Sequence, residues 1–492
     1  MTQEICPSLN HWPHKSFDQF QIYVHPDLEL NLIENRITKF ALIGYMIDPR
    51  YPERSNTEIL NDMIKFANSF ESVSEYLYSL SGRFVLVVNI SGKTSIFHDP
   101  CGLRSVYYSQ YEGKKYVGSQ PSIFSHVIPL TEGDMFFSYK NSEYRNGHSE
   151  HWTPSGCSLY ENIQQLIPNH YLCIQSLKQI RYWPNRKLQE RKLDDVIYET
   201  SELLTRLMQA GNVRFNLALA LTAGIDSRML LGACKKIAKN IFFVTLLCRK
   251  LRPDSADIQI PRKILKKAGY RHHLIDCRKN IDVLFSGIYR SNVSNSREDL
   301  ENLVHGMFGQ YPQNRVFVLG NISEISRCFY YKSGKHPPIY SVKQLIELED
   351  GWKELNFVCD QLSDWYSEIQ EIVNVSGIDI LDLFYWEHRM GSWLSQSQLE
   401  YDIVLESYTP FNHRGLLEAM LGVPQCYRCA PDYILQKKIA TVLWPEIMEQ
   451  PVNPPYTIKA ICINLLYRFG LADIAIKILM HLRLVQWVSK LP

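Results

Sequence analysis

The segment FNLALALTAGIDSR, residues 215–228, contains the pattern on which the interpretation of this chain depends. It begins as a short apolar run, which is typical of a fully buried strand. A tight turn containing Gly224 follows, and Met229–Cys234 has the composition of a helix start. Hydroxyl groups at Thr222 and Ser227, together with backbone N–H groups at a helix N-terminus, form an anion cradle that fits phosphate.

The same turn carries a carboxylate, Asp226, which could hold a magnesium ion that bridges phosphate oxygens. The alternative is an ordinary strand, turn and helix in which Asp226 only caps the helix. The six residues alone leave both interpretations open. If the turn is a phosphate site, the residues expected to bind the ligand are Leu221, Thr222, Ala223, Gly224, Asp226, Ser227, Thr245 and Gly320.

Length and composition indicate a globular protein of two or three domains, since the chain has 492 residues and 45% of them are apolar. A formal net charge of +2 gives no reason to expect nucleic acid as a partner. The cysteines are scattered, which fits reduced thiols better than a disulfide framework. The N-terminus lacks the pattern of a signal peptide, and no apolar stretch is long enough to span a membrane, so we expect a cytoplasmic protein.

Alternating strand and helix patterns surround the organising segment. Leu193–Gln209 has helical spacing, Ile241–Leu247 is a second buried strand, Asp257–Ala268 is a helix and His273–Asp276 is a third strand. This alternation predicts a parallel sheet with right-handed crossovers. Ligands of such sheets bind at the carboxyl ends of the strands, where the turn at residues 222–227 and Thr245 fall. Further upstream, Asn56–Phe70 also has helical spacing.

Four segments carry a family resemblance. Residues 222–227, TAGIDS, resemble the pyrophosphate-binding loop of the ATP pyrophosphatases, which is usually Ser-Gly-Gly-x-Asp-Ser. Upstream, LSGRF at 80–84, DPCGLRSVYY at 99–108 and IQQLIPNHYL at 163–172 resemble glutaminase-domain segments of the asparagine synthetase family. The resemblance covers residues 40–450 and keeps the family's order.

The resemblance implies a two-domain fold. Residues 1–190 would form a class II glutamine amidotransferase-like domain, an Ntn-type αββα sandwich. Residues 191–492 would form an adenine-nucleotide-hydrolase-like synthetase domain with a parallel sheet and a helical C-terminal part. The fold class is therefore α/β and α+β.

The first domain departs from the family at its chemistry. Class II glutaminases use an N-terminal cysteine thiol with its own α-amine as base, but Thr2 follows Met1 here and the nearest cysteine is Cys6. The family's glutamine-binding Asn-Gly-Glu corresponds to residues 43–45, Ile-Gly-Tyr. We therefore expect a scaffold without glutaminase activity. Removal of a short propeptide to expose Cys6 is the alternative.

A second acidic motif follows the apolar strand Val316–Gly320. Asn-Ile-Ser-Glu at 321–324 falls where the family has an Asp-Glu motif whose Asp helps to hold magnesium. Glu324 is retained, while Ser323 stands in the place of the Asp, so a magnesium site would depend on Asp226 and Glu324. The alternative is a glutamate at the start of a helix. Arg327 would either meet phosphate oxygens or be solvated.

Other positions match the family in part. LESYTPFNHR at 405–414 resembles its Glu-x-Arg-x-Pro-Phe-x-Asp segment, which makes Glu406 a catalytic candidate beside Asp226 and Glu324. Glu387 and Arg389 would lie where a helix faces the acyl pocket. The family's phosphate-binding lysine is missing from Gln450–Asn453, and the sequence does not decide whether Lys437, Lys438 or Lys459 replaces it.

Two features have two interpretations each. Asp257 would lie near the nucleotide or would be a helix N-cap, and we expect the N-cap. The apolar tail 458–491, with spaced basic residues, could dock on a membrane surface or a partner. The more usual alternative is that such helices pack on their own domain.

The resemblance implies an ATP-dependent carbon–nitrogen ligase that uses ATP and Mg2+, adenylates a carboxylate and releases pyrophosphate. The acyl group of a small-molecule, peptide or glycan substrate would pass to an amine that does not come from glutamine, as in β-lactam synthetases and lasso-peptide macrolactam synthetases. Two alternatives are a glutamine-hydrolysing amidotransferase acting on aspartate or a sugar acid, and a non-catalytic binding protein of the same fold.

Overall fold

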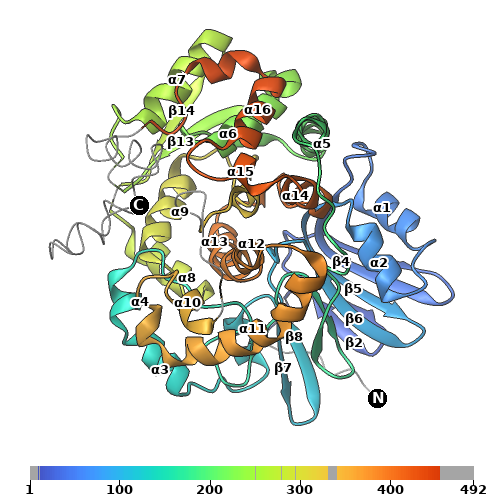
Figure 1. The fold of residues 1–492 in the computed structure, drawn as a ribbon. Helices are drawn as coiled ribbons and strands as arrows, with labels where there is room; N and C mark the ends of the chain where they lie inside the picture. The colour runs from blue at the N-terminus through green and yellow to red at the C-terminus, as the bar shows by residue number, and fades with distance from the viewer. Residues whose placement is uncertain are drawn as a thin grey trace.

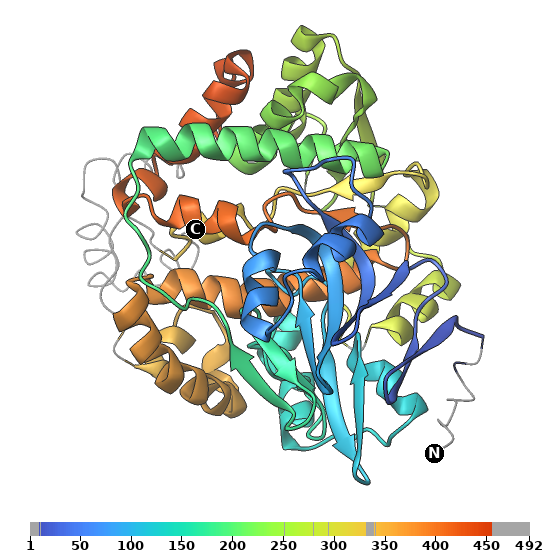
Figure 2. The same ribbon diagram turned by 90° about the vertical axis from the view of Figure 1, so that its right-hand side faces the viewer.

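The computed structural model describes residues 9, 11–249, 251–278, 280–293, 295–330, 339 and 341–454. These residues form a mixed α/β protein with antiparallel sheets, one parallel sheet and a helical C-terminal part (Figures 1 and 2). Cys6 and the tail 458–491 lie outside the described residues. None of the described helices is long and apolar enough to span a membrane.

The first half is built on a six-stranded antiparallel sheet with two different faces. Its strands, in spatial order, are β11 (Lys178–Arg181), β10 (His170–Cys173), β6 (Lys93–His98), β5 (Ser81–Ile90), β4 (Thr38–Ile47) and β3 (Leu30–Glu34). Side chains alternate between the two faces of a strand. Phe40 and Leu42 of β4 thus pack with the helices α1 (Asn56–Met63) and α2 (Phe70–Leu77), while Ala41 packs on the opposite face.

The opposite face of that sheet packs against a second, three-stranded sheet. Its strands are β8 (Lys114–Gly118), β7 (Tyr107–Tyr111) and β9 (Gln164–Gln165). Val85 and Val87 of β5 share a buried apolar cluster with Tyr108 of β7 and with Leu166. The layers of this half are therefore helices, a large sheet and a small sheet. A separate hairpin joins β1 (His14–Phe17) and β2 (Phe20–Tyr23).

The second half contains a five-stranded parallel sheet with β12 at its centre. The spatial order is β14 (His272–Asp276), β13 (Phe242–Leu247), β12 (Leu217–Ala220), β15 (Val316–Val318) and β16 (Ser407–Tyr408). The helices that connect or precede these strands are α5 (Leu193–Arg214), α6 (Ile225–Ala233), α7 (Ala256–Ala268), α8 (Val283–Asn292) and α9 (Glu298–Gln310). This is the parallel sheet that the alternating pattern predicts.

Most of the remaining helices follow β15 in the chain. They are α10 (Val342–Ile346), α11 (Asn356–Ser376), α12 (Ile380–Phe384), the π-helix η6 (Tyr385–Leu394), α13 (Ser395–Tyr401), α14 (Arg414–Leu421), α15 (Gln425–Arg428) and α16 (Ile434–Leu443). Short 3-10 helices include η4 (Ser323–Arg327) and η7 (Pro445–Glu449). Two short helices of the first half, α3 (Asp134–Lys140) and α4 (Glu143–Gly147), precede β9.

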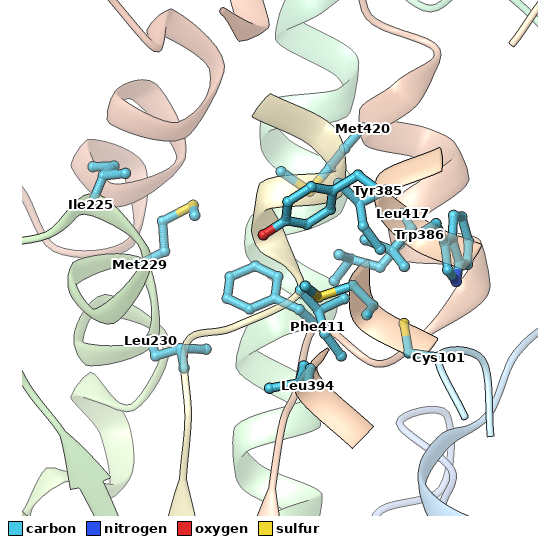
Figure 3. Packing of buried hydrophobic residues seen from close by; sticks show 14 of the residues in the cluster. Cys101, Ile225, Met229, Leu230, Tyr385, Trp386, Leu394, Phe411, Leu417 and Met420 are labelled. Carbon is cyan, nitrogen blue, oxygen red and sulfur yellow. The ribbon is translucent and has the colours of Figure 1, made fainter. Parts of the chain in front are cut away.

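One large apolar core runs through both halves. It contains Ile47 and Leu103 from the first half as well as Leu219 and Met229 from the second. Figure 3 shows Met229 of α6 on one side of this core and Tyr385 on the other, with the Tyr385 hydroxyl turned toward α6. Helix α5 is the long green helix of Figure 2, which runs between the blue first half and the yellow-green part of the second half. The two halves thus share a continuous interior.

Candidate functional site

The turn after β12 has the shape that an anion cradle needs. Helix α6 begins with Gly224 as its N-cap, and no side chain caps it. The Thr222 hydroxyl accepts a hydrogen bond from the Gly224 N–H at 3.1 Å, and the Ser227 hydroxyl accepts one from the Thr222 N–H at 3.2 Å. The two hydroxyl oxygens lie 3.3 Å apart. The helix itself supplies no acceptors for its first-turn N–H groups, so these are available to an anion.

Ala223 does not obstruct this cradle. Its methyl group is fully buried in the large apolar core, on the inner side of the turn. Its N–H donates to Asp257 Oδ1 at 2.9 Å. The N-cap of α7 is Ser255, so the expectation that Asp257 is an N-cap is wrong. Asp257, in the first turn of α7, instead stabilises the turn after β12 through this hydrogen bond.

The turn after β15 packs closely against the turn after β12. A Cβ atom on Gly320 would lie 3.1 Å from Ser227 N and 3.2 Å from Asp226 Cβ, so any larger residue would be tightly packed against the turn after β12. Ile322 is fully buried with a φ of 80°, a backbone conformation that a β-branched residue adopts at a cost of about 1–3 kcal/mol. The Ser323 hydroxyl donates to Asp226 Oδ1. Strain at this position is a feature of ligand-binding turns.

Two carboxylates meet between these turns, with a guanidinium group between them. Arg327 Nη2 lies 3.2 Å from Asp226 Oδ2 and 3.3 Å from Glu324 Oε1. Arg327 is therefore an ion-pair partner and is not solvated. Burial and then the Asp226 charge raise the pKa of Glu324 to about 7, while Arg327 acts in the opposite direction. Glu324 Oε2 is buried and has no hydrogen-bond partner among the described residues.

Asp226 and Glu324 fit a magnesium ion held by two carboxylates. Magnesium is usually bound through one or two carboxylates, with water and substrate phosphates as its other ligands. The described part of the chain has no group of three or more His, Cys, Asp or Glu residues that could hold a metal by itself. Glu324 Oε2 has no partner and could bind the metal directly. Arg327 would have to move before Asp226 Oδ2 and Glu324 Oε1 could bind it. Magnesium thus stays a prediction.

Arg389 of helix η6 forms a second charged pair close to this site. Arg389 Nη1 lies 2.9 Å from Glu349 Oε1, which also accepts the Tyr330 hydroxyl at 2.9 Å. The charge of Arg389 also lowers the pKa of Glu324. π-helices are rare and occur often at functional sites. Glu387 on the same helix is instead fully buried, where it accepts from Trp365 Nε1 at 2.7 Å and pairs with Arg181.

Thr245 is close to the turn, but its hydroxyl is used within the protein. It donates to Leu221 O at 2.6 Å and lies 2.8 Å from His272 Nε2. The Leu221 N–H donates to Val244 O at 2.8 Å. Thr245 and Leu221 therefore fix the end of β12, and the structure shows them as supports of the turn.

Glu406 lies at the wrong end of the sheet to act with Asp226 and Glu324. It precedes β16, and the Phe317 N–H donates to its carbonyl at the start of β15. The turn that carries Asp226 follows the carboxyl end of β12, roughly 13 Å away if four strand residues rise about 3.3 Å each. The Glu406 carboxylate pairs with Arg83 Nη1 and Arg104 Nη2, both at 2.7 Å. The placement of Glu406 in one site with the other two residues is thus corrected, because its carboxylate joins the two halves.

The C-terminal segment of the described chain lies on the turn after β12. The Asn453 N–H donates to Ala223 O at 3.1 Å, and Asn453 Oδ1 is 3.6 Å from where a Cβ on Gly224 would be. Lys438 is exposed and lies 3.6 Å from Asp194 on α5. Lys459 is outside the described residues. Asn453 is not predicted as a site residue, because the family resemblance indicates only that a lysine is missing from residues 450–453.

The comparisons with known proteins give partial matches among solved structures alone. No family model matches this chain, and no curated protein matches it. Among solved structures, it is similar to "the allosteric regulatory enzyme of purine biosynthesis" with 14% identity and a TM-score of 0.23, over 56% of this chain and 62% of that one. It is also similar to glutamine phosphoribosylpyrophosphate amidotransferase from B. subtilis complexed with ADP and GMP, with 12% identity and a TM-score of 0.23, over 58% of this chain and 79% of that one.

Proposed function

We propose that this protein is an ATP-dependent carbon–nitrogen ligase that forms an amide or a lactam and releases AMP and pyrophosphate. One observation carries the proposal. At the carboxyl ends of the adjacent parallel strands β12 and β15, a hydroxyl-lined turn that opens α6 faces a strained turn that supplies a second carboxylate. This is the edge of a parallel sheet at which ligands bind.

The residues of the two turns have distinct roles in this proposal. Thr222, Ser227 and the first-turn N–H groups of α6 would bind the terminal phosphates, since helix N-termini favour negative charge. Asp226 and Glu324 would hold magnesium, which supplies charge neutralisation when it is bound. Arg327 is long enough to exchange its two carboxylate partners for phosphate oxygens. The protein's contribution is therefore positioning and electrostatic stabilisation.

The reaction joins a carboxylate to an amine in two displacements. The substrate carboxylate attacks the α-phosphorus of ATP and pyrophosphate leaves. The amine then attacks the acyl carbon of the acyl-adenylate, AMP leaves, and the amine loses a proton. Tyr45 supports an amine source other than glutamine, because its hydroxyl donates to Ser407 O inside the shared core. The position that corresponds to the family's glutamine-binding Glu is thus occupied by a packing residue.

Pyrophosphate release tests the proposal. The full chain is incubated with ATP, Mg2+ and a panel of amino acids, peptides and sugar acids, each with an amine donor. Asp226→Ala is expected to abolish release that depends on the carboxylate. Asp254→Ala is the matched control, since Asp254 is exposed and pairs with Arg252. Equal release by the Asp226→Ala variant and the wild type would contradict the proposal.

A nucleotide-binding protein without ligase activity is the second candidate. The position of Arg327 favours it, because its guanidinium group already pairs with both carboxylates that would hold the metal. This candidate predicts that ATP binds without magnesium and is not consumed. Binding measured with and without EDTA separates the two candidates, since the ligase requires the metal.

A further inference from the structure

Arg228 is a buried cation without a buried anion. It follows Ser227 on α6 and is 1% exposed. Its guanidinium donates to four carbonyl oxygens, those of Gln450 at 2.6 Å, Pro451 at 2.9 Å, Ile447 at 3.2 Å and Ala223 at 3.4 Å. Among the described residues no carboxylate forms an ion pair with it, and its Nε has no hydrogen-bond partner.

A buried charge without a counter-charge lowers the stability of the fold, so its presence points to a functional role. Carbonyl oxygens accept from both Nη groups, but they leave Nε unpaired and a full positive charge in a poorly solvated place. Burial lowers the pKa of Arg228 to about 10, so the group is still protonated at neutral pH. The neighbouring residues of α6 belong to the large apolar core. The turn after β12 therefore has a buried positive charge behind it.

The carbonyl groups that Arg228 binds belong to the two segments that form the cradle. Ala223 O belongs to the turn, and the other three belong to residues 447–451, which lead directly to Asn453. Asn453 is exposed and has a φ of 45°, a conformation that Asn tolerates better than most residues. Its backbone N–H is bound to Ala223 O. Arg228 thus fixes the position at which the Asn453 side chain meets the edge of the turn.

We propose that Arg228 is the cation of the phosphate site, acting from behind the turn, and that it positions Asn453 to donate its side-chain amide to the bound phosphate. This inference rests on the proposed function, because it requires the turn to bind a polyphosphate. It identifies which residues take over from the lysine that is missing from residues 450–453. Arg228 is a positioning residue, since it reaches the ligand through its charge and through Asn453.

Binding of pyrophosphate and tripolyphosphate to the full chain in the presence of Mg2+ tests the inference. Dissociation constants are compared for the wild type, Arg228→Lys and Arg228→Gln. We expect Arg228→Lys to stay within about threefold of the wild type, and Arg228→Gln to bind about tenfold more weakly. The loss should be larger for tripolyphosphate than for pyrophosphate, because a charge effect grows with ligand charge. Equal losses for the two ligands, or none, would overturn the inference.

Asn453 provides variants that do not depend on a buried residue. Asn453→Asp keeps the shape and the backbone preference but adds a negative charge, and Asn453→Gly keeps only the backbone freedom. We expect affinity to fall from Asn to Gly and again, by about tenfold, from Gly to Asp. An Asp variant that binds as tightly as the wild type would overturn the inference. If the wild type binds neither polyphosphate, the proposed function fails as well, whereas failure of the variants alone leaves it standing.

Discussion

Glu324→Gln should make the protein more stable while it removes function. The Glu324 carboxylate is buried between Asp226 and Arg327, with one oxygen unpartnered. Burial and the Asp226 charge raise its pKa from 4.5 to about 7, which corresponds to at most about 3.5 kcal/mol because each pKa unit is worth ~1.4 kcal/mol. A glutamine has the same shape and no charge to bury.

The sign of the pH dependence follows from the raised pKa. Between about pH 4.5 and pH 7 the folded protein binds a proton that the unfolded chain has lost. The contribution of Glu324 to stability is thus full below pH 4.5, declines as the pH rises toward 7 and stays low above it. The Glu324→Gln variant lacks this decline. It should be about 1–3 kcal/mol more stable than the wild type at pH 8 and close to it at pH 4.5.

Urea unfolding in EDTA at several pH values measures this difference. Glu446→Gln is the matched control, because Glu446 is exposed and its nearest cation, Lys235, is 3.8 Å away. The control should follow the wild type at every pH. A Glu324→Gln variant with the wild-type pH slope, or with lower stability at pH 8, would refute the reasoning. The same variant should release little pyrophosphate, which would show that Glu324 is kept for function at the expense of stability.

Two further substitutions test the geometry. Glu406→Gln should lower the free energy of unfolding by about 2–3 kcal/mol without changing ATP affinity, since it weakens charged hydrogen bonds to Arg83 and Arg104 away from the site. Urea unfolding measures the stability and ATP titration measures the affinity. A tenfold loss of affinity would show that Glu406 belongs to the site. Gly320→Ala should weaken ATP binding by about tenfold, because the new Cβ would lie 3.1 Å from the Ser227 backbone; unchanged affinity would show that the turns are not tightly apposed.

The sequence predicts the second half well because its signals are local. The apolar run before Thr222, the glycine in the turn and the helix that follows are all neighbours in the chain. The structure has β12 in the apolar run, and α6 follows the turn but begins at Ile225, before the expected start at Met229. In the first half, one helix over residues 56–70 is predicted, but α1 ends at Met63 and α2 begins at Phe70. The serine at position 69 caps the new helix, with its side chain accepting from the Ser72 N–H. Ser72 stands at the position where the usual capping pattern has Glu or Gln, so the pattern does not mark this helix start in the sequence.

The charges of the site are not predictable from neighbouring residues. Arg327 reaches Asp226 across 101 positions of the chain, and Asn453 reaches Ala223 across more than 200. The periodicity of apolar residues along the chain carries no information about contacts between residues so far apart in sequence. Glu406 is the opposite case. A family motif suggests that Glu406 belongs to the site, but the direction of β16 places it at the other edge of the sheet.

Calorimetric titration of the full chain with ATP in the presence of Mg2+ tests the central claim most directly. The turn at residues 222–227 is expected to bind one ATP, and Asp226→Ala is expected to weaken that binding by about tenfold or more. Absence of any binding by the wild type, or equal affinity in the Asp226→Ala variant, would contradict the claim that this turn holds a nucleotide's phosphates.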